Sequence, residues 1–367
     1  MRDRSVDVFV VPTKGPGDVS GVLALIESGR LDPTTIVAIL GKTEGNGGVN
    51  DFTREFAVSA LCNALAPSLK LTPEGVAEKV AMVMSGGTEG VLSPHLTVFA
   101  RKAAKSSDAT GKRLSIGIAQ TRDFLPEEIG RQAQIDETAK AVRAAMADGG
   151  ITGTADVHFV QIKCPLLTAD RVEAAQARGK KTATISSYGS MGYSRGASAL
   201  GVAVSLGEIP GARDEDVLKT WSLYSAVAST SAGIELMHNV VIVMGNSDTS
   251  ASPFVIGHAV MQDAIDMSAV IDALASVKIN LAQLTDAAAP SRLVNILAKA
   301  EASLDGSVRG FRHTMLDDSD INATRHARAA VGGLIAGVAG TGLVYVSGGA
   351  EHQGPLGGGP VAVIARA

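Results

Sequence analysis

Three lysines in this sequence each end an apolar, strand-like segment, and one of them stands in each third of the chain. They are Lys42, Lys163 and Lys299. In each third, a later strand-like segment ends in a serine that two small residues follow. These serines are Ser85, Ser231 and Ser347. A serine beside a neutral lysine can act as a nucleophile with its own base in acyl transfer. Three copies in the same order predict one composite site on a pseudo-threefold axis.

A lysine can accept a proton near neutral pH only if its pKa is lowered. Burial and neighbouring positive charges both lower it, and three lysines converging at strand ends would supply both effects. A single lysine at a strand end is more often one whose ammonium reaches solvent. The threefold repetition favours a site over that alternative, but it does not decide which lysine is neutral at rest.

Small residues follow each serine in a repeated pattern. The first of them is Gly86, Ala232 or Gly348, and the next is always glycine. Such residues leave backbone N–H groups open to a bound oxygen, as an oxyanion hole requires. The alternative is a tight turn that only ends a strand.

An arginine stands between the lysine and the serine of each third, where a helix of small residues is predicted to begin. In the first two thirds it is Arg54 and Arg195. The last third offers Arg325 and Arg328. We favour Arg328 because, like Arg195, it is followed by two small residues and an apolar helix. An arginine there can donate a planar pair of hydrogen bonds to a carbonyl or imide edge; the alternative is an arginine that faces solvent.

Each third of the chain has the same predicted order of elements. A strand and a helix come first, then the lysine strand, the arginine helix, the serine strand and a closing strand. This alternation predicts an α/β (α+β) fold in which helices cover sheet faces. Polar connectors at 101–112 and 245–253 divide the chain into units 1–104, 112–249 and 254–367. The second unit carries insertions, expected around 179–192 and 207–216.

The composition restricts the class of protein. The chain has 367 residues, 46% hydrophobic and 19% charged, which is typical of a globular core. A net charge of −4 argues against nucleic acid as a partner. Cys62 and Cys164 have no CxxC spacing, so we expect no disulfide framework and a reducing cytoplasm. No apolar signal segment opens the sequence.

Several weaker motifs can be set aside. The uncharged stretch 329–350 is long enough to span a membrane, but its glycines and its strand-like end favour a buried helix, a turn and a strand. Gly41-Lys42-Thr43 resembles the end of a phosphate-binding loop that would need glycine at position 36, which is Ile36. The histidines lack zinc-site spacing, and no dinucleotide-binding fingerprint follows the first strand.

The whole chain resembles the cyanuric acid hydrolase/barbiturase family, and more closely its cyanuric acid hydrolases. The resemblance rests on the three Lys/Arg/Ser sets and on two strings, 231–236 and 347–355. It implies three similar units around one central site, a homotetramer, and hydrolytic ring opening of a cyclic amide. Cyanuric acid would give carboxybiuret, which loses carbon dioxide to form biuret. A threefold-symmetric ring suits a small site that presents the same donors three times.

The resemblance also implies a role for each residue of the site. Ser231 would be the nucleophile and Lys163 its base. The other lysines and serines would mainly bind substrate, together with the arginines and the backbone amides. These binding residues are Lys42, Arg54, Ser85, Gly86, Arg195, Ala232, Lys299, Arg328, Ser347 and Gly348.

The resemblance further implies a structural divalent cation, Mg²⁺, and no organic cofactor. The ligands would be Glu301 and a loop after Ser347, largely through backbone carbonyls. The loop residues are Ala350, Gln353, Gly354, Pro355 and Gly358. Oxygen ligands suit such a hard cation.

Two other functions stay open. Barbiturase, in the same family, opens barbituric acid to ureidomalonate, and the choice between the rings would lie near Thr324 or Arg325. A protein that only binds a planar cyclic imide would use the same donors without chemistry. A structural scaffold is disfavoured, because buried lysines without a ligand would be costly.

Overall fold

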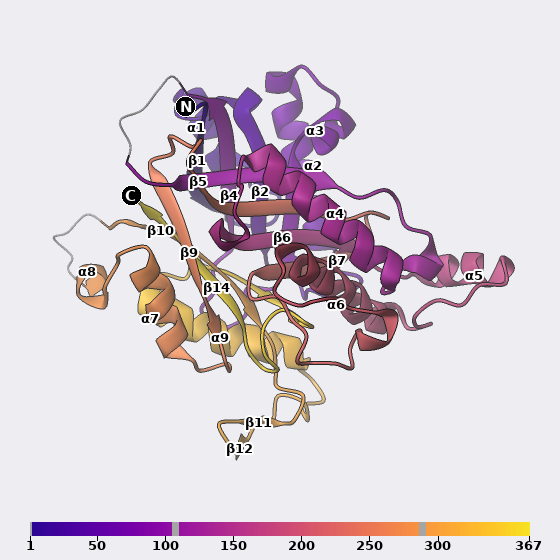
Figure 1. The fold of residues 1–367 in the computed structure, drawn as a ribbon. Coiled ribbons are helices and arrows are strands. Elements are labelled where there is room, and N and C mark those ends of the chain that lie inside the picture. The colour runs from indigo at the N-terminus through magenta and orange to yellow at the C-terminus, as the bar shows by residue number, and fades with distance from the viewer. Residues whose placement is uncertain (1, 105–109, 286–290) are drawn as a thin grey trace.

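Three four-stranded sheets form the computed structural model, which describes residues 2–104, 110–285 and 291–367 (Figure 1). The first sheet has the order β1-β4-β2-β3, the second β5-β8-β6-β7 and the third β9-β14-β10-β13. The three pairings of each sheet follow one scheme. The first strand of the unit and the lysine strand both run antiparallel to the closing strand, and the lysine strand runs parallel to the serine strand. The expected α/β fold of three similar units is confirmed.

The strands of the three sheets occupy equivalent places in their units. The first sheet consists of β1 (Arg4–Pro12), β2 (Ile36–Thr43), β3 (Ala81–Gly86) and β4 (His95–Ala103). The second consists of β5 (Arg113–Gln120), β6 (Val157–Pro165), β7 (Ala228–Gly233) and β8 (Val240–Ser247). The third consists of β9 (Phe254–Met261), β10 (Leu293–Ala300), β13 (Tyr345–Gly348) and β14 (Gly359–Arg366). Part of the predicted connector 101–112, residues 105–109, lies outside the described residues.

The helices also recur by position. The first helix of each unit is α1 (Ser20–Glu27), α4 (Gln132–Gly149) or α7 (Met267–Ser276). The helix between the parallel strands is α2 (Phe52–Leu69), α6 (Ser187–Leu206) or α9 (Ala323–Ala339). Elements outside this scheme are α3 (Pro73–Lys79), α5 (Ala169–Ala177), α8 (Leu281–Thr285) and the hairpin β11 (Ser307–Val308) and β12 (Phe311–Arg312).

The three crossover helices begin and end by the same physical means. Asp51, Ser186 and Asn322 cap their first turns, each accepting a backbone N–H with its side chain, which satisfies a donor that the helix itself cannot pair. Each helix then ends at a residue in the left-handed conformation, Lys70 for α2 and a glycine for the other two. Such fixed ends hold the helices, and the residues they carry, at defined places over the sheets.

The three sheets share one apolar core. A single cluster of buried residues takes members from every sheet, among them Phe99, Phe159 and Tyr345. Separate clusters lie between each sheet and its own helices. The units therefore pack together through their sheets rather than as separate domains joined by linkers.

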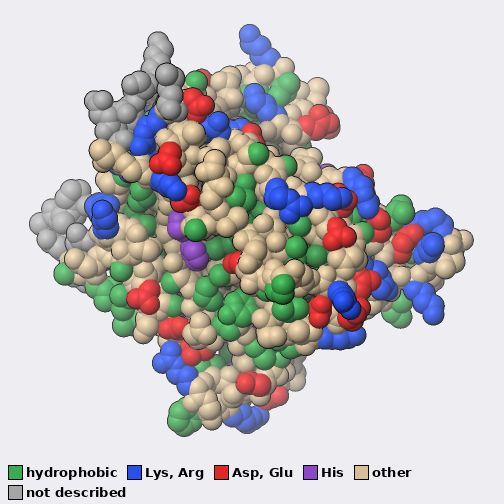
Figure 2. All heavy atoms as spheres, in the orientation of Figure 1, with side chains coloured by type: hydrophobic (Ala, Val, Ile, Leu, Met, Phe, Trp, Pro, Cys, Tyr) green, Lys and Arg blue, Asp and Glu red, His purple; other side chains and the backbone are tan. Residues whose placement is uncertain are grey.

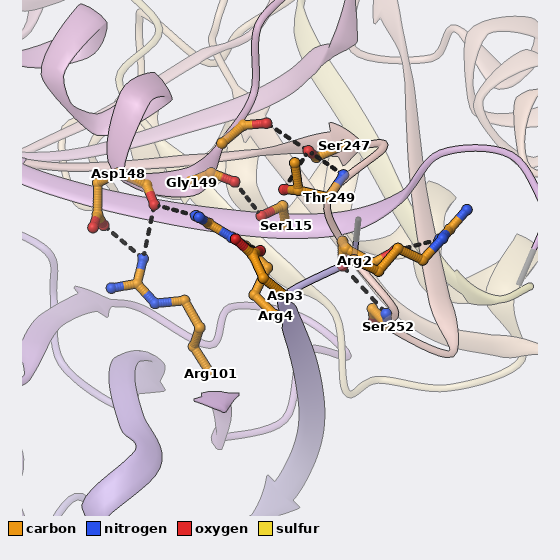
Figure 3. Close-up of polar contacts among 12 residues, drawn as sticks. Arg2, Asp3, Arg4, Arg101, Ser115, Asp148, Gly149, Ser247, Thr249 and Ser252 are labelled. Carbon is orange, nitrogen blue, oxygen red and sulfur yellow. Dashed lines mark hydrogen bonds and ion pairs between the residues drawn. The ribbon is translucent and has the colours of Figure 1, made fainter. Parts of the chain in front are cut away.

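Arginines of the first unit hold the end of a helix of the second (Figure 3). Arg4 donates to the carbonyl of Asp148, and Arg101 forms an ion pair of 2.6 Å with the Asp148 carboxylate. Ser115 donates to the carbonyl of Gly149, the last residue of α4. Positive groups at a helix C-terminus are favourable because they face the negative end of its dipole.

The uncharged stretch 329–350 forms the end of α9, a turn and β13, as predicted. Within the described ranges, no helix combines the length and apolar character that a membrane crossing needs. Both cysteines are free and buried. Basic and acidic side chains are interspersed over the face drawn in Figure 2.

Candidate active site

One small pocket is lined by residues of all three units, with an empty volume of about 280 Å³. It lies where the lysine and serine strands end. Its lining residues are Gly47, Arg54, Met84, Ser85, Gly86, Met191, Arg195, Ser231, Ala232, Arg328, Ser347 and Gly348. The structure thus brings together every predicted binding residue except the lysines, whose side chains lie beneath the lining. Gly47, Met84 and Met191 were not predicted from the sequence.

Strand register places each lysine beside its serine. Lys42 is opposite Ser85, Lys163 opposite Ser231, and Lys299 opposite Ser347. The first and third pairs are hydrogen-bonded, with 3.2 Å from each lysine Nζ to the serine Oγ.

The second pair differs from the other two. Among the described residues, Lys163 has no hydrogen bond to Ser231; its Nζ lies 2.7 Å from Oε1 of Glu235. The hydroxyl of Ser231 is instead 3.2 Å from that of Ser347. The pair expected to react is therefore the one whose lysine has a carboxylate partner.

Burial lowers the pKa of all three lysines, each at most 1% exposed. For Lys42 and Lys299 the charge of a nearby arginine acts in the same direction, and the pKa of Lys299 falls to about 7. For Lys163, burial lowers the pKa while the Glu235 carboxylate opposes the shift. Burial raises the pKa of a carboxyl, but Lys163 outweighs it and brings the pKa of Glu235 to about 2.

The arginines lie deeper and farther along their helices than expected. Arg195 and Arg328 do not open α6 and α9, which begin at Ser187 and Ala323, so that prediction is wrong. Each helix starts earlier because a polar residue caps it upstream. Arg328 is 4% exposed and lines the pocket, whereas Arg325 is 42% exposed and lies outside the pocket lining.

Two of the arginines are paired with carboxylates from another unit. Arg195 donates twice to Glu351, at 2.7 and 2.6 Å. Arg328 donates twice to Glu89, at 2.8 and 2.5 Å. Two parallel bonds fix the plane of a guanidinium as well as its position.

Arg54 has a different set of partners. It donates to the carbonyls of Gly48, at 2.7 Å, and Ala232, at 3.2 Å. Among the described residues it forms no ion pair, so its charge is not neutralised by direct contact.

Sequence reasoning missed the glutamates, although a signal for them was present. A glutamate stands four residues after each serine: Glu89, Glu235 and Glu351. Their partners could not be inferred, because each glutamate binds a residue that is distant in the sequence.

The glycine that ends each serine turn makes room for these charged pairs. Gly87 and Gly349 have φ of 106° and 77°, which side-chain-bearing residues rarely adopt. A Cβ on Gly349 would lie 2.6 Å from the Arg195 guanidinium, and one on Gly87 equally close to that of Arg328. The turns therefore position the arginines in addition to leaving amides open.

A buried phenol lies under the pocket. Tyr345 is fully buried, and its hydroxyl makes no hydrogen bond of normal geometry with the described residues. Burial raises its pKa, while the hydroxyls of Ser85 and Ser231 oppose the shift. It is thus a neutral group beside two of the serines.

Glu301, the one carboxylate among the residues expected to hold a metal ion, is half-buried and hydrogen-bonded to the loop that carries the others. Glu301 accepts from the N–H of Ala350 at 2.6 Å and, in the described part of the chain, forms no ion pair. Its carboxylate oxygens are ligands of the kind that a hard cation prefers. No cluster of three or more His, Cys, Asp or Glu side chains suited to a metal occurs among the described residues, so such an ion would depend on backbone carbonyls.

Comparison with known proteins covers nearly the entire chain. Residues 7–366 match the model of the ring-opening amidohydrolase proteins. The cyanuric acid amidohydrolases of Bradyrhizobium diazoefficiens and Pseudomonas sp. strain ADP are 72% and 59% identical; the first alignment covers 100% of this chain and 99% of the relative, the second 99% of each.

Solved structures agree with these matches. A cyanuric acid hydrolase described as an innovation by structural concatenation superposes with a TM-score of 0.96 at 58% identity, over 100% of both chains. The cyanuric acid hydrolase of A. caulinodans superposes with a TM-score of 0.89 at 50% identity, over 99% of both chains. This chain belongs to the ring-opening amidohydrolase family, whose members hydrolyse cyclic amides.

Proposed function

We propose that this protein opens the ring of cyanuric acid by hydrolysis, giving carboxybiuret, which then loses carbon dioxide to form biuret. The observation that carries the proposal is the pocket itself, where three Lys–Ser pairs and three arginines surround one small volume. Cyanuric acid has three equivalent carbonyls and three ring nitrogens. Each of the three units can therefore contact one of three equivalent edges of the ring. The relatives at 72% and 59% identity bear the name of this activity.

In the proposed mechanism, Ser231 attacks one ring carbonyl. Lys163 first gives up the proton that its contact with Glu235 favours, and its neutral amine then takes the Ser231 hydroxyl proton. The new C–O bond leaves an oxyanion that nearby backbone N–H groups stabilise. The ring C–N bond then breaks, and the leaving nitrogen takes the proton from the Lys163 ammonium. Water hydrolyses the resulting acyl ester and restores the Ser231 hydroxyl.

The missing hydrogen bond between Lys163 and Ser231 is compatible with this role. The two residues are register partners on adjacent parallel strands, so their side chains start from neighbouring positions. Catalytic hydrogen bonds are often long in an unliganded site and tighten when substrate binds.

The other two pairs and the arginines would hold the ring. Ser85 and Ser347 already accept hydrogen bonds from their lysines, which leaves their own protons for substrate. Arg195 and Arg328 are fixed by carboxylates, so they can present N–H groups to ring carbonyls at little entropic cost.

A divalent cation, Mg²⁺ in our proposal, would be held by Glu301 with carbonyls of the loop 350–358 and would stabilise that loop. We also propose a cytoplasmic homotetramer. Chelation by EDTA should lower the melting temperature, and an unchanged melting temperature would refute the metal proposal. Sedimentation should give the mass of four chains, and the mass of a monomer would refute the homotetramer.

The assay that tests the function uses purified protein with cyanuric acid and, separately, barbituric acid. Cyanuric acid should give one biuret and one carbon dioxide per ring, at a kcat/KM well above that for barbituric acid. Preference for barbituric acid would identify a barbiturase instead. Saturable binding without product would identify a non-catalytic binder.

A further inference from the structure

The glutamate that follows each serine turn breaks the threefold symmetry of the site. Glu89 of the first unit binds Arg328 of the third, and Glu351 of the third binds Arg195 of the second. Continuing this cycle, Glu235 of the second unit should bind Arg54 of the first. It binds Lys163 of its own unit instead.

We propose that Glu235 is a positioning residue for the reacting pair, and that its carboxylate makes Lys163, rather than Lys42 or Lys299, the lysine that takes the serine proton. This inference rests on the proposed function. The carboxylate holds the ammonium that forms when Ser231 gives up its proton. A third group that orients a base and stabilises its charged form is the general logic of catalytic triads.

The burial of the two partners suits this role. The Lys163 side chain is 2% exposed and that of Glu235 is 35% exposed. An ammonium formed in a buried place needs a compensating anion, and Glu235 supplies one at 2.7 Å. The other two lysines have no carboxylate at salt-bridge distance among the described residues, because Glu89 and Glu351 are already bound to arginines.

The difference among the lysines follows from their charged neighbours. The largest charge effect on Lys42 comes from Arg328, which disfavours its protonated form, although Glu89 and Asp51 act in the opposite direction. Lys163 faces Glu235 on one side and Arg54 of α2 on the other. With a carboxylate in direct contact, Lys163 is therefore a stronger base than Lys42, and a stronger base takes up the serine proton more completely.

The remaining groups around the pair do not replace Glu235. Arg171 of α5 points its guanidinium at the carbonyls of Leu166 and Ile234. Burial raises the pKa of Cys164, so that thiol stays neutral. Gly233 lies between the partners, because a Cβ there would be 2.2 Å from Glu235 and 2.6 Å from the Lys163 side chain.

The test compares Glu235→Gln with Glu89→Gln, the same substitution at an equivalent position. Steady-state rates on cyanuric acid are measured from pH 5 to 10. Removing the Glu235 charge should lower kcat by roughly 10- to 100-fold. It should also move the acid limb of the kcat profile down by about one pH unit or more, because Lys163 loses a neighbouring anion.

The Glu89→Gln variant should raise KM, since Arg328 loses its partner, and should leave the acid limb in place. An acid limb that does not move in Glu235→Gln, or that moves equally in both variants, overturns the inference. A wild-type protein without turnover refutes the proposed function instead, so the two failures are distinguishable.

A second measurement follows the lysines themselves in the wild-type protein. In wild-type protein carrying ¹³Cε-lysine, with signals assigned through Lys→Met variants, the Lys163 signal should titrate at a higher pH than that of Lys42. A Lys163 signal that titrates at the same pH as Lys42 or at a lower pH contradicts the inference.

Discussion

The hydroxyl oxygens of Ser231 and Ser347 lie 3.2 Å apart, although 116 positions separate them in the sequence. They end equivalent strands of two different sheets, β7 and β13. Ser85, at the end of β3, lines the same pocket. The three units therefore build one site between them.

The third arginine of the site should be Arg328 and not Arg325. Both contact Glu89, but only Arg328 lies in the pocket. Changing Arg328→Lys keeps the charge and removes the planar pair of donors. KM for cyanuric acid should rise by roughly tenfold, which corresponds to a loss of about 1.4 kcal/mol of substrate-binding free energy. Arg325→Lys is the matched control and should change KM less than threefold; equal effects would show that both arginines bind substrate.

The Gly349 turn should not tolerate a side chain. Its φ of 77° is unfavourable for alanine, and the new Cβ would meet the Arg195 guanidinium. Gly349→Ala should lower kcat/KM by at least tenfold and reduce stability by about 1–2 kcal/mol. Gly337→Ala in α9 is the control, because no atom lies within 4 Å of the added Cβ. It should stabilise the protein by up to about 1 kcal/mol; activity loss in both variants would contradict this explanation.

A histidine pair between the second and third units should make stability depend on pH. Nδ1 of His158 lies 2.8 Å from Nδ1 of His258, so only one of these two nitrogens carries a proton. Burial, with His258 nearby, lowers the pKa of His158 to about 4, and burial lowers that of His258.

The sign of the effect follows from linkage. Between pH 6.5 and 4 the unfolded chain binds more protons than the folded one, so stability falls as the pH falls through that window. His158 should contribute a loss of about 2 kcal/mol between pH 7 and 5. Denaturant unfolding at the two pH values checks this, and His158→Gln should reduce the difference. An equal loss in that variant would refute the role of the pair.

The order of elements and the convergence of the lysines and serines could be predicted from the sequence. Apolar strands that end in Lys42 and Ser85 recur with the same neighbours in every unit, and similar sequences fold into similar sheets. The pocket lining followed from that repetition, including Arg54 and Gly348.

The charged partners of these residues could not be predicted in the same way. Glu89 and Arg328 belong to different units, and only the packing of the sheets brings them together. The contact of Lys163 with Glu235, in place of a hydrogen bond to Ser231, could not be predicted either. Glu235 binds a residue of its own unit, whereas Glu89 and Glu351 each bind an arginine of another unit.

The most direct test of the account replaces the three serines by alanine one at a time and measures kcat and KM for cyanuric acid. Ser231→Ala should lower kcat by on the order of 10³-fold or more. Ser85→Ala and Ser347→Ala should mainly raise KM. A Ser231→Ala protein that retains a near-wild-type rate would contradict the assignment of Ser231 as the nucleophile.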